Sequence, residues 1–181
     1  RTTGPVTSPS SSAPTTEAVE QTPSDGQASG NENSPSPSPS FSLPSGLVRQ
    51  DGPGGYTIGV PQGWTRQVKG NSVFWHDPVS EAYVQVDRTG WTGDPEQHWI
   101  GWEREVIAKN ALPDYRRVSL TRTSVDGVPA ADLEFTWTGK HGIDRGIVVD
   151  GRSYAVFVAV PESRWNQYRV TVNNVIDSFR P

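Results

Sequence analysis

Two carboxylates on one predicted strand have the spacing that acid–base chemistry can use. Asp132 and Glu134 lie two residues apart, and side chains at i and i+2 of a strand point to the same face of the sheet. One carboxyl group of such a pair can act as the acid and the other as the base. The alternative is a structural role, in which the carboxylates pair with Arg117 or Arg145 across the sheet. We favour the structural role.

The three histidines do not form a recognisable metal site. His76, His98 and His141 are the only imidazoles in the sequence, and none has the spacing of the common zinc motifs. Asp94 and His98 lie four residues apart on a predicted helix and could offer two ligands. A third ligand is missing, however, and Asp94 is better placed to cap the helix. We therefore expect no metal and no cofactor.

The signatures of the common catalytic classes are also missing from the sequence. There is no G-x-S-x-G elbow, no S-x-x-K pair and no Walker A loop, and the protein-kinase motifs H-R-D, D-F-G and A-P-E do not occur. The absence of cysteine excludes thiol catalysis and disulfides. We therefore expect that these 181 residues are not an enzyme and do not themselves transfer phosphate.

One tryptophan lies in a loop that offers it no evident place in a core. The loop is Gly90-Trp-Thr-Gly93, and its glycines favour a flexible connection. Its indole offers a large apolar face and one N–H donor, and the helix start that follows offers amides with partial positive charge. These features suit an anionic or carbohydrate ligand, although the loop can also be a lid packed on the domain edge. The predicted ligand or partner contacts are Trp91, Thr92, Asp94 and His98.

The elements that position these residues follow from hydrophobic periodicity and turn residues. Three strands are predicted at Tyr56–Val60, Val73–Trp75 and Ala82–Val86. Asp94 and Pro95 start a helix that runs to about Asn110, because Asp94 can accept from the free amides and proline suits the first helical position. A hairpin around Asp126-Gly127 and a loop at Gly139–Gly142 follow.

The last third of the chain predicts the centre of the fold. Asp150-Gly151 favours a tight turn between Ile147–Val149 and Tyr154–Val160, and the second run has no polar residue. A strand with apolar side chains on both faces must be covered on both faces. The segment from Trp165 to Phe179 carries apolar residues at helical spacing. The element order β-β-β-α-β-β-β-β-α predicts an α+β fold, an antiparallel sheet of six or seven strands sandwiched with two helices.

Composition divides the chain near residue 46. Residues 1–46 hold twelve Ser, eight Pro and six Thr with one aromatic residue, so they cannot bury enough apolar surface to fold. We predict a disordered linker over 1–46 and one domain over 47–181. The net charge of -4 disfavours nucleic acid as a partner. No apolar run reaches the roughly 20 residues of a membrane span, so any membrane attachment is expected through a tether upstream of Arg1.

Several short motifs carry a family resemblance. They are Tyr56-Thr-Ile-Gly-Val-Pro-Gln-Gly-Trp64, Phe74-Trp-His-Asp-Pro78, Tyr83-Val-Gln-Val86, Asp94-Pro-x-x-x-Trp99 and Asp177-Ser-Phe-Arg-Pro181. With the Ser/Pro/Thr segment before them, they resemble the extracytoplasmic C-terminal domain of actinobacterial receptor-type serine/threonine protein kinases, and related domains of secreted lipoproteins. The resemblance implies a Mog/PsbP-like fold, with a kinase domain and a membrane helix upstream of Arg1.

The resemblance also implies a function. We expect a non-catalytic sensor or interaction domain outside the cytoplasm, tethered to the cell membrane, that meets an unidentified cell-envelope ligand or a partner protein. The alternative is a secreted lipoprotein with a ligand-binding or carrier role. The resemblance implies no defined set of ligand-binding residues.

Overall fold

The computed structural model describes residues 42–181, so the predicted linker falls mostly on residues outside the described part. Residues 42–181 form nine strands, two α-helices and one short 3-10 helix. In chain order they are β1 (Leu47–Asp51), β2 (Thr57–Pro61), β3 (Thr65–Lys69), β4 (Ser72–His76), β5 (Tyr83–Asp87), α1 (Pro95–Ala108), β6 (Arg116–Val125), β7 (Val128–Trp137), β8 (Lys140–Val149), β9 (Arg152–Pro161), η1 (Glu162–Arg164) and α2 (Trp165–Ser178). Within this part no helix is both long and apolar enough to cross a bilayer.

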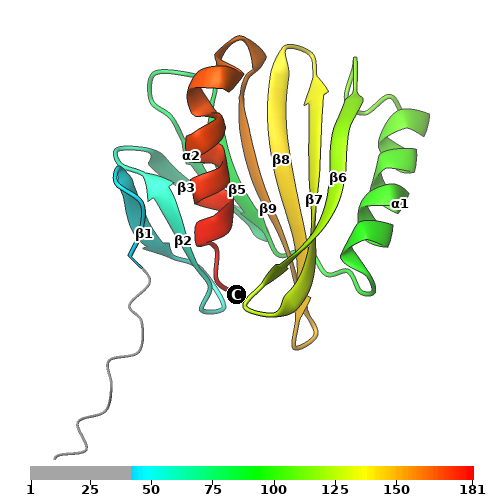
Figure 1. Cartoon of the computed structure of the whole chain (residues 1–181), viewed down its shortest axis with the longest axis horizontal. Coiled ribbons are helices and arrows are strands. Elements are labelled where there is room, and N and C mark those ends of the chain that lie inside the picture. Colours follow the sequence, from blue (N-terminus) through cyan, green and yellow to red (C-terminus); the bar gives the residue numbers. More distant parts are fainter. Residues whose placement is uncertain (1–41) are drawn as a thin grey trace, which may run out of the picture. The chain divides into compact units, whose positions relative to one another are not determined.

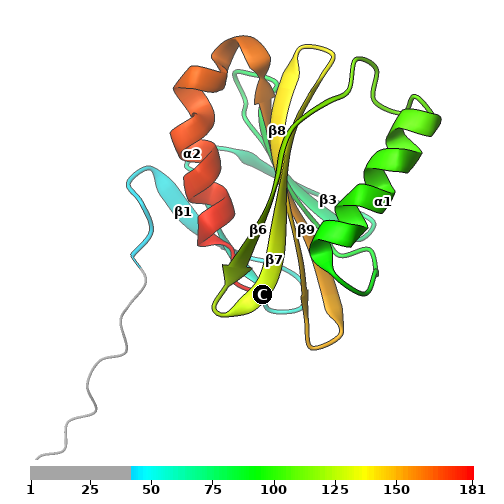
Figure 2. The ribbon, with the colours of Figure 1, turned by 45° about the vertical axis from the view of Figure 1, so that its right-hand side comes forward.

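Seven strands form one antiparallel sheet in the order β3-β4-β5-β9-β8-β7-β6, and β1 pairs with β2 in a separate two-stranded sheet. Strand β9 is the middle strand of the seven, as its continuous apolar run predicts. Helices α1 and α2 lie on opposite faces of the large sheet (Figures 1 and 2). The predicted α+β sandwich with two helices is therefore confirmed.

The turns between the long strands have the backbone that their sequences require. Asp126-Gly127 and Asp150-Gly151 each have positive φ at both residues, the conformation of a tight two-residue hairpin. The predicted loop at Gly139–Gly142 is wrong, because the turn is made by Thr138-Gly139, again with positive φ at both residues. Strand β8 therefore begins at Lys140, and all ten of its residues pair with β9.

Five strands precede α1 where three were predicted. Strand β3 was missed because all five of its residues are exposed, so that no apolar alternation marks it. It lies at one edge of the large sheet and is held by its pairing with β4. Strand β1 was missed because it has no fully buried residue and, among the strands of residues 42–181, pairs with β2 alone.

The core divides between the two faces of the large sheet. On the first face, β2 and α2 pack over β4, β5, β8 and β9, with Tyr56, Trp75, Tyr154 and Phe179 among the largest buried side chains. The predicted stripe of α2 is confirmed, since Val172, Val175 and Ile176 are buried and Trp165 and Tyr168 pack beside them. On the second face, α1 packs over β7 and β8.

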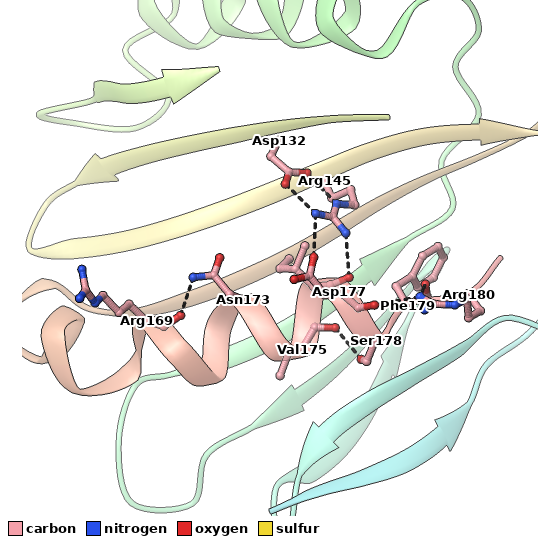
Figure 3. A network of polar contacts seen from close by, with 10 residues as sticks. Asp132, Arg145, Arg169, Asn173, Val175, Asp177, Ser178, Phe179 and Arg180 are labelled. Carbon is pink, nitrogen blue, oxygen red and sulfur yellow. Dashed lines mark hydrogen bonds and ion pairs between the residues drawn. The ribbon is translucent and has the colours of Figure 1, made fainter. Parts of the chain in front are cut away.

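Arg145 fastens the end of α2 to the first face of the sheet (Figure 3). Its guanidinium donates to both carboxylate oxygens of Asp132, with each N···O distance 2.7 Å. It also donates to the carbonyl oxygen of Ile176 at 3.2 Å and lies 3.0 Å from a carboxylate oxygen of Asp177. Arg145 is only 6% exposed, so its buried charge is balanced by these partners.

The carboxylate pair on β7 therefore has structural partners. Asp132 binds Arg145, one of the two partners considered for it, and Glu134 lies 2.7 Å from Nε2 of His141. Arg117 lies instead 3.3 Å from Glu103 of α1. The His141 ring stacks on Trp165 with 3.6 Å between the ring centroids. These contacts hold η1 and α2 against the sheet and agree with the structural role that we favoured.

Candidate functional site

A cavity of about 490 Å³ opens on the second face of the large sheet, beside α1. Helix α1 packs on β6, β7 and β8, and the cavity extends from the helix toward β9 and β5. We call it the aromatic pocket. The aromatic side chains that line it are Tyr83, Trp91, Trp99, Trp102, Phe135, Trp137 and Phe157, and its polar side chains are Gln85, Asp87, Thr89, His98 and Asp144.

The alternation of the strands and the period of α1 bring these rings together. Phe135 and Trp137 lie on one face of β7, and Phe157 lies on the same face of β9, so that the rings of Phe135 and Phe157 stack at 5.5 Å. Trp99 and Trp102 lie one turn apart on α1 and face the sheet. The Trp99 indole donates to the carbonyl oxygen of Ala131 at 3.0 Å, which fixes that wall of the pocket.

Two glycines of β8 allow the rings of Phe157 and Trp99 to pack directly on the strand backbone. A Cβ atom at Gly142 would lie 2.5 Å from the ring of Phe157, and one at Gly146 would lie 3.0 Å from the indole of Trp99. Asp144 stands between these glycines on the same face of the strand. Its carboxyl group therefore emerges from the floor of the pocket between two aromatic rings.

The Asp144 carboxyl is the unusual group of the pocket. Its Oδ1 atom is closed to solvent and has no hydrogen-bond partner among the described residues, whereas the rest of the side chain keeps surface open to the pocket. Burial raises the pKa of Asp144 to about 8, and the negative charges of Asp87 and Asp132 add to the rise. At neutral pH the carboxyl is therefore mostly protonated.

Asp87 is a second carboxylate of the pocket, but its oxygens are occupied. They accept from the Ser72 hydroxyl and from the Thr89 backbone N–H, the latter at 2.7 Å. Burial alone would raise the pKa of Asp87, but these hydrogen bonds outweigh it and bring the pKa below its ordinary value. Gln85 joins the same network by donating to Ser72 at 3.0 Å.

Trp91 closes one side of the pocket. Its ring stacks on His98 with the centroids 3.9 Å apart and the planes at 11°. The backbone N–H of Trp91 donates to the hydroxyl of Ser153, which in turn donates to the carbonyl oxygen of Thr89. The loop is thus fastened to the start of β9. Burial lowers the pKa of His98, so that its ring is neutral at neutral pH.

The structure places the four predicted contact residues in two groups. Trp91 and His98 line the aromatic pocket together. Thr92 is exposed and outside the pocket lining, and Asp94 caps α1 by accepting from the Gln97 N–H at 3.0 Å while it pairs with Arg122. Within residues 42–181 no group of three metal-ligating side chains lies together.

Sequence reasoning missed the floor of the pocket. The segment Gly142-Ile-Asp-Arg-Gly146 contains a lone carboxylate between two glycines on one strand face, a signal that was hidden because the first of these residues was assigned to a loop. The structure leaves Trp102 and Trp137 half-buried at the pocket wall.

Solved structures with similar folds share this architecture. The solution structure of cyanobacterial PsbP from Synechocystis has a TM-score of 0.61 and 18% identity, covering 79% of this chain and 99% of that one. The Ran-binding protein Mog1p of Saccharomyces cerevisiae has a TM-score of 0.55 and 12% identity, and the match covers 77% of this chain and 96% of that one. A Pseudomonas aeruginosa protein of unknown function, described as a putative regulator, has a TM-score of 0.51 and 12% identity, and the match covers 75% of this chain and 96% of that one. The predicted Mog/PsbP-like fold is confirmed.

The comparison with curated protein sequences found no match. The model of a domain family, described as the serine/threonine kinase C-terminal domain, matches residues 48–181. This description names a domain that accompanies a kinase and differs from the catalytic domain itself. The match confirms the resemblance that the short motifs carry. Over these residues the chain belongs to the serine/threonine kinase C-terminal domain family.

Proposed function

We propose that this domain is the non-catalytic sensor domain of a serine/threonine kinase and that it binds a small ligand in the aromatic pocket. The observation that carries the proposal is the pocket itself. Ligand sites are concave, mostly apolar and supplied with a few polar groups, and they measure roughly 300 to 1,000 Å³. The aromatic pocket has this size and this lining, and it contains the Asp144 carboxyl, which has a raised pKa and an oxygen without a hydrogen-bond partner within residues 42–181.

The proposal places the domain outside the cytoplasm, tethered to the membrane through a segment upstream of Arg1. Membership of the kinase C-terminal family supports this placement, since a sensor joined to a kinase can pass the presence of a ligand across a membrane. The Ser/Pro/Thr composition of residues 1–46 is typical of a spacer between a domain and its attachment point.

A ligand screen with a blocked pocket tests the binding role. Ala155 lines the pocket, and Ala155→Phe adds a ring that fills part of the cavity. Compounds that raise the melting temperature of residues 42–181 should lose this effect in Ala155→Phe and keep it in Ala111→Phe, a control at an exposed position. Compounds that bind all three proteins equally would place the binding site elsewhere and contradict the proposal.

A topology measurement tests the placement. Intact cells that produce the protein should be labelled by an antibody against residues 42–181 without permeabilisation. Labelling that requires permeabilised cells would place the domain in the cytoplasm and contradict the sensor role outside the membrane, while leaving the ligand screen unaffected.

A further inference from the structure

We infer that the aromatic pocket binds an organic cation, a protonated amine or a quaternary ammonium group on a small apolar body, with the Asp144 carboxylate as its counter-ion. The inference rests on the proposed function, because it names the ligand class of the same pocket. It goes further than the proposed function because it assigns recognition of the ligand's positive charge to the Asp144 carboxylate.

The first argument is the position of Asp144. Its Oδ1 atom lacks a hydrogen-bond partner among the described residues, and a buried acceptor without a partner is unfavourable unless a ligand supplies the missing donor. The neighbouring Gly142 and Gly146 hold no side chain that can reach it, and the rings of Phe157 and Trp99 beside it offer little hydrogen bonding to the carboxyl. The part of the carboxyl group that stays open to the pocket can accept from a protonated amine, and a quaternary ammonium group there can balance its negative charge.

The second argument is the chemistry of the walls. Seven aromatic rings line the pocket, and the faces of Trp, Tyr and Phe attract a cation within about 6 Å of the ring centroid. Rings from β5, β7, β9 and α1 surround the space above Asp144, so that an ammonium group there would meet a carboxylate below and π-faces at its sides. The same rings accept the apolar body of the ligand.

The third argument is the balance of charge. None of the described residues that line the pocket is a lysine or an arginine, so no internal cation competes for Asp144. Asp87, the other carboxylate, already accepts from Ser72 and Thr89. The described polar side chains are too few and too occupied to match the many hydroxyl groups of a sugar. They therefore favour a cationic ligand over the carbohydrate or anion that the loop sequence suggests.

The inference predicts how affinity changes with pH. The titratable groups that face or influence Asp144 are Tyr83 and Asp87 from β5, His98 from α1 and Asp132 from β7. Burial raises the pKa of Tyr83 to about 12, whereas the pKa values of Asp87 and His98 are lowered. Asp144 is the group of this set whose pKa is raised to about 8, so we expect its carboxyl to determine how affinity changes near that pH. A quaternary ammonium ion should bind about tenfold more tightly per pH unit up to about pH 8 and then reach a plateau.

The experiment compares two probes of the same shape on residues 42–181. Phenyltrimethylammonium carries a permanent charge, and tert-butylbenzene replaces its nitrogen by carbon. At pH 9 the charged probe should bind the wild type more tightly than the neutral probe does. Asp144→Asn should reduce the affinity of the charged probe roughly tenfold to a hundredfold without changing the affinity of the neutral probe. Asp150→Asn, in an exposed turn with positive φ that asparagine accepts, removes one carboxylate elsewhere and should change neither affinity.

The outcomes separate the inference from the proposed function. If both probes bind equally to the wild type and to Asp144→Asn, the pocket is a ligand site but the cation inference is wrong. If neither probe binds, the cation inference is wrong and the ligand screen alone decides the proposed function. If Ala155→Phe binds both probes as well as the wild type does, the pocket is not the site and the proposed function fails with the inference. The pH profile of the wild type alone gives a second test, since a flat profile between pH 6.5 and 8 would refute the role of Asp144 even if the variant does not fold.

Discussion

Asp144 should make the stability of the domain depend on pH. A carboxyl group whose pKa rises on folding holds its proton more tightly in the folded state. Below the unfolded pKa of 3.8 the carboxyl is protonated in both states and does not lower the free energy of unfolding. As pH rises from 3.8 toward about 8, the unfolded state loses the proton first, so the free energy of unfolding falls. A pKa change of this size corresponds to at most about 6 kcal/mol. Water that enters the open pocket screens the charge, so we expect a loss of about 2 to 3 kcal/mol between pH 5 and pH 9.

The Asp144→Asn variant isolates this contribution, because asparagine has nearly the same shape and no charge at any pH. Urea unfolding followed by tryptophan fluorescence should already show the variant as the more stable protein at pH 5, because pH 5 lies above the unfolded pKa of 3.8. Between pH 5 and pH 9 this difference should grow by the expected 2 to 3 kcal/mol. Asp150→Asn should follow the wild type at both pH values. Parallel pH profiles for the wild type and Asp144→Asn would refute the reasoning, since they would mean that water solvates the carboxyl as fully as in the unfolded chain.

Three further substitutions test how the fold supports the pocket, each by urea unfolding. Arg145→Ala should cost about 3 to 5 kcal/mol, because it leaves Asp132 without the partner that balances its charge. Gly142→Ala should cost about 1 to 3 kcal/mol, because the new Cβ meets the ring of Phe157. Phe179→Ala should cost about 3 to 5 kcal/mol through the cavity it leaves beneath α2.

Matched controls come from exposed or open positions elsewhere in the domain. Gly101→Ala on α1 meets no atom within 4 Å and should stabilise the domain by about 0.5 to 1 kcal/mol. Val170→Ala removes an exposed apolar side chain of α2, and Arg49→Ala removes an exposed charge, so each should change stability by less than about 0.5 kcal/mol. A loss as large in a control as in its partner variant would show that the assignment of buried contacts is wrong.

The sequence was sufficient for the parts of the fold that local chemistry decides. Asp126-Gly127 and Asp150-Gly151 predict tight turns because their backbone needs positive φ, and Asp94-Pro95 predicts the start of α1 because cap and proline are local signals. The exposed edge strand β3 carries no such signal. Its formation depends on the pairing offered by β4, which only the assembled sheet provides.

The pocket depends even more on tertiary structure. Trp91 and His98 were found because a tryptophan between glycines is conspicuous in the sequence. Asp144 was not, because its meaning comes from the rings that lie over Gly142 and Gly146, and those rings come from β9 and α1. A carboxylate in a strand is ordinary until the structure shows that no residue of the described part, 42–181, pairs with it.

The seven tryptophans provide the most direct measurement of the central claim, that the aromatic pocket is the ligand site. Trp91, Trp99, Trp102 and Trp137 line the pocket, whereas three others lie away from it. Those three are Trp64, Trp75 and Trp165. In a ¹H–¹⁵N spectrum of residues 42–181, phenyltrimethylammonium should shift the indole signals of the four pocket tryptophans and leave the other three in place. Shifts confined to those three, or no shift of any indole signal at saturating probe, would contradict the account.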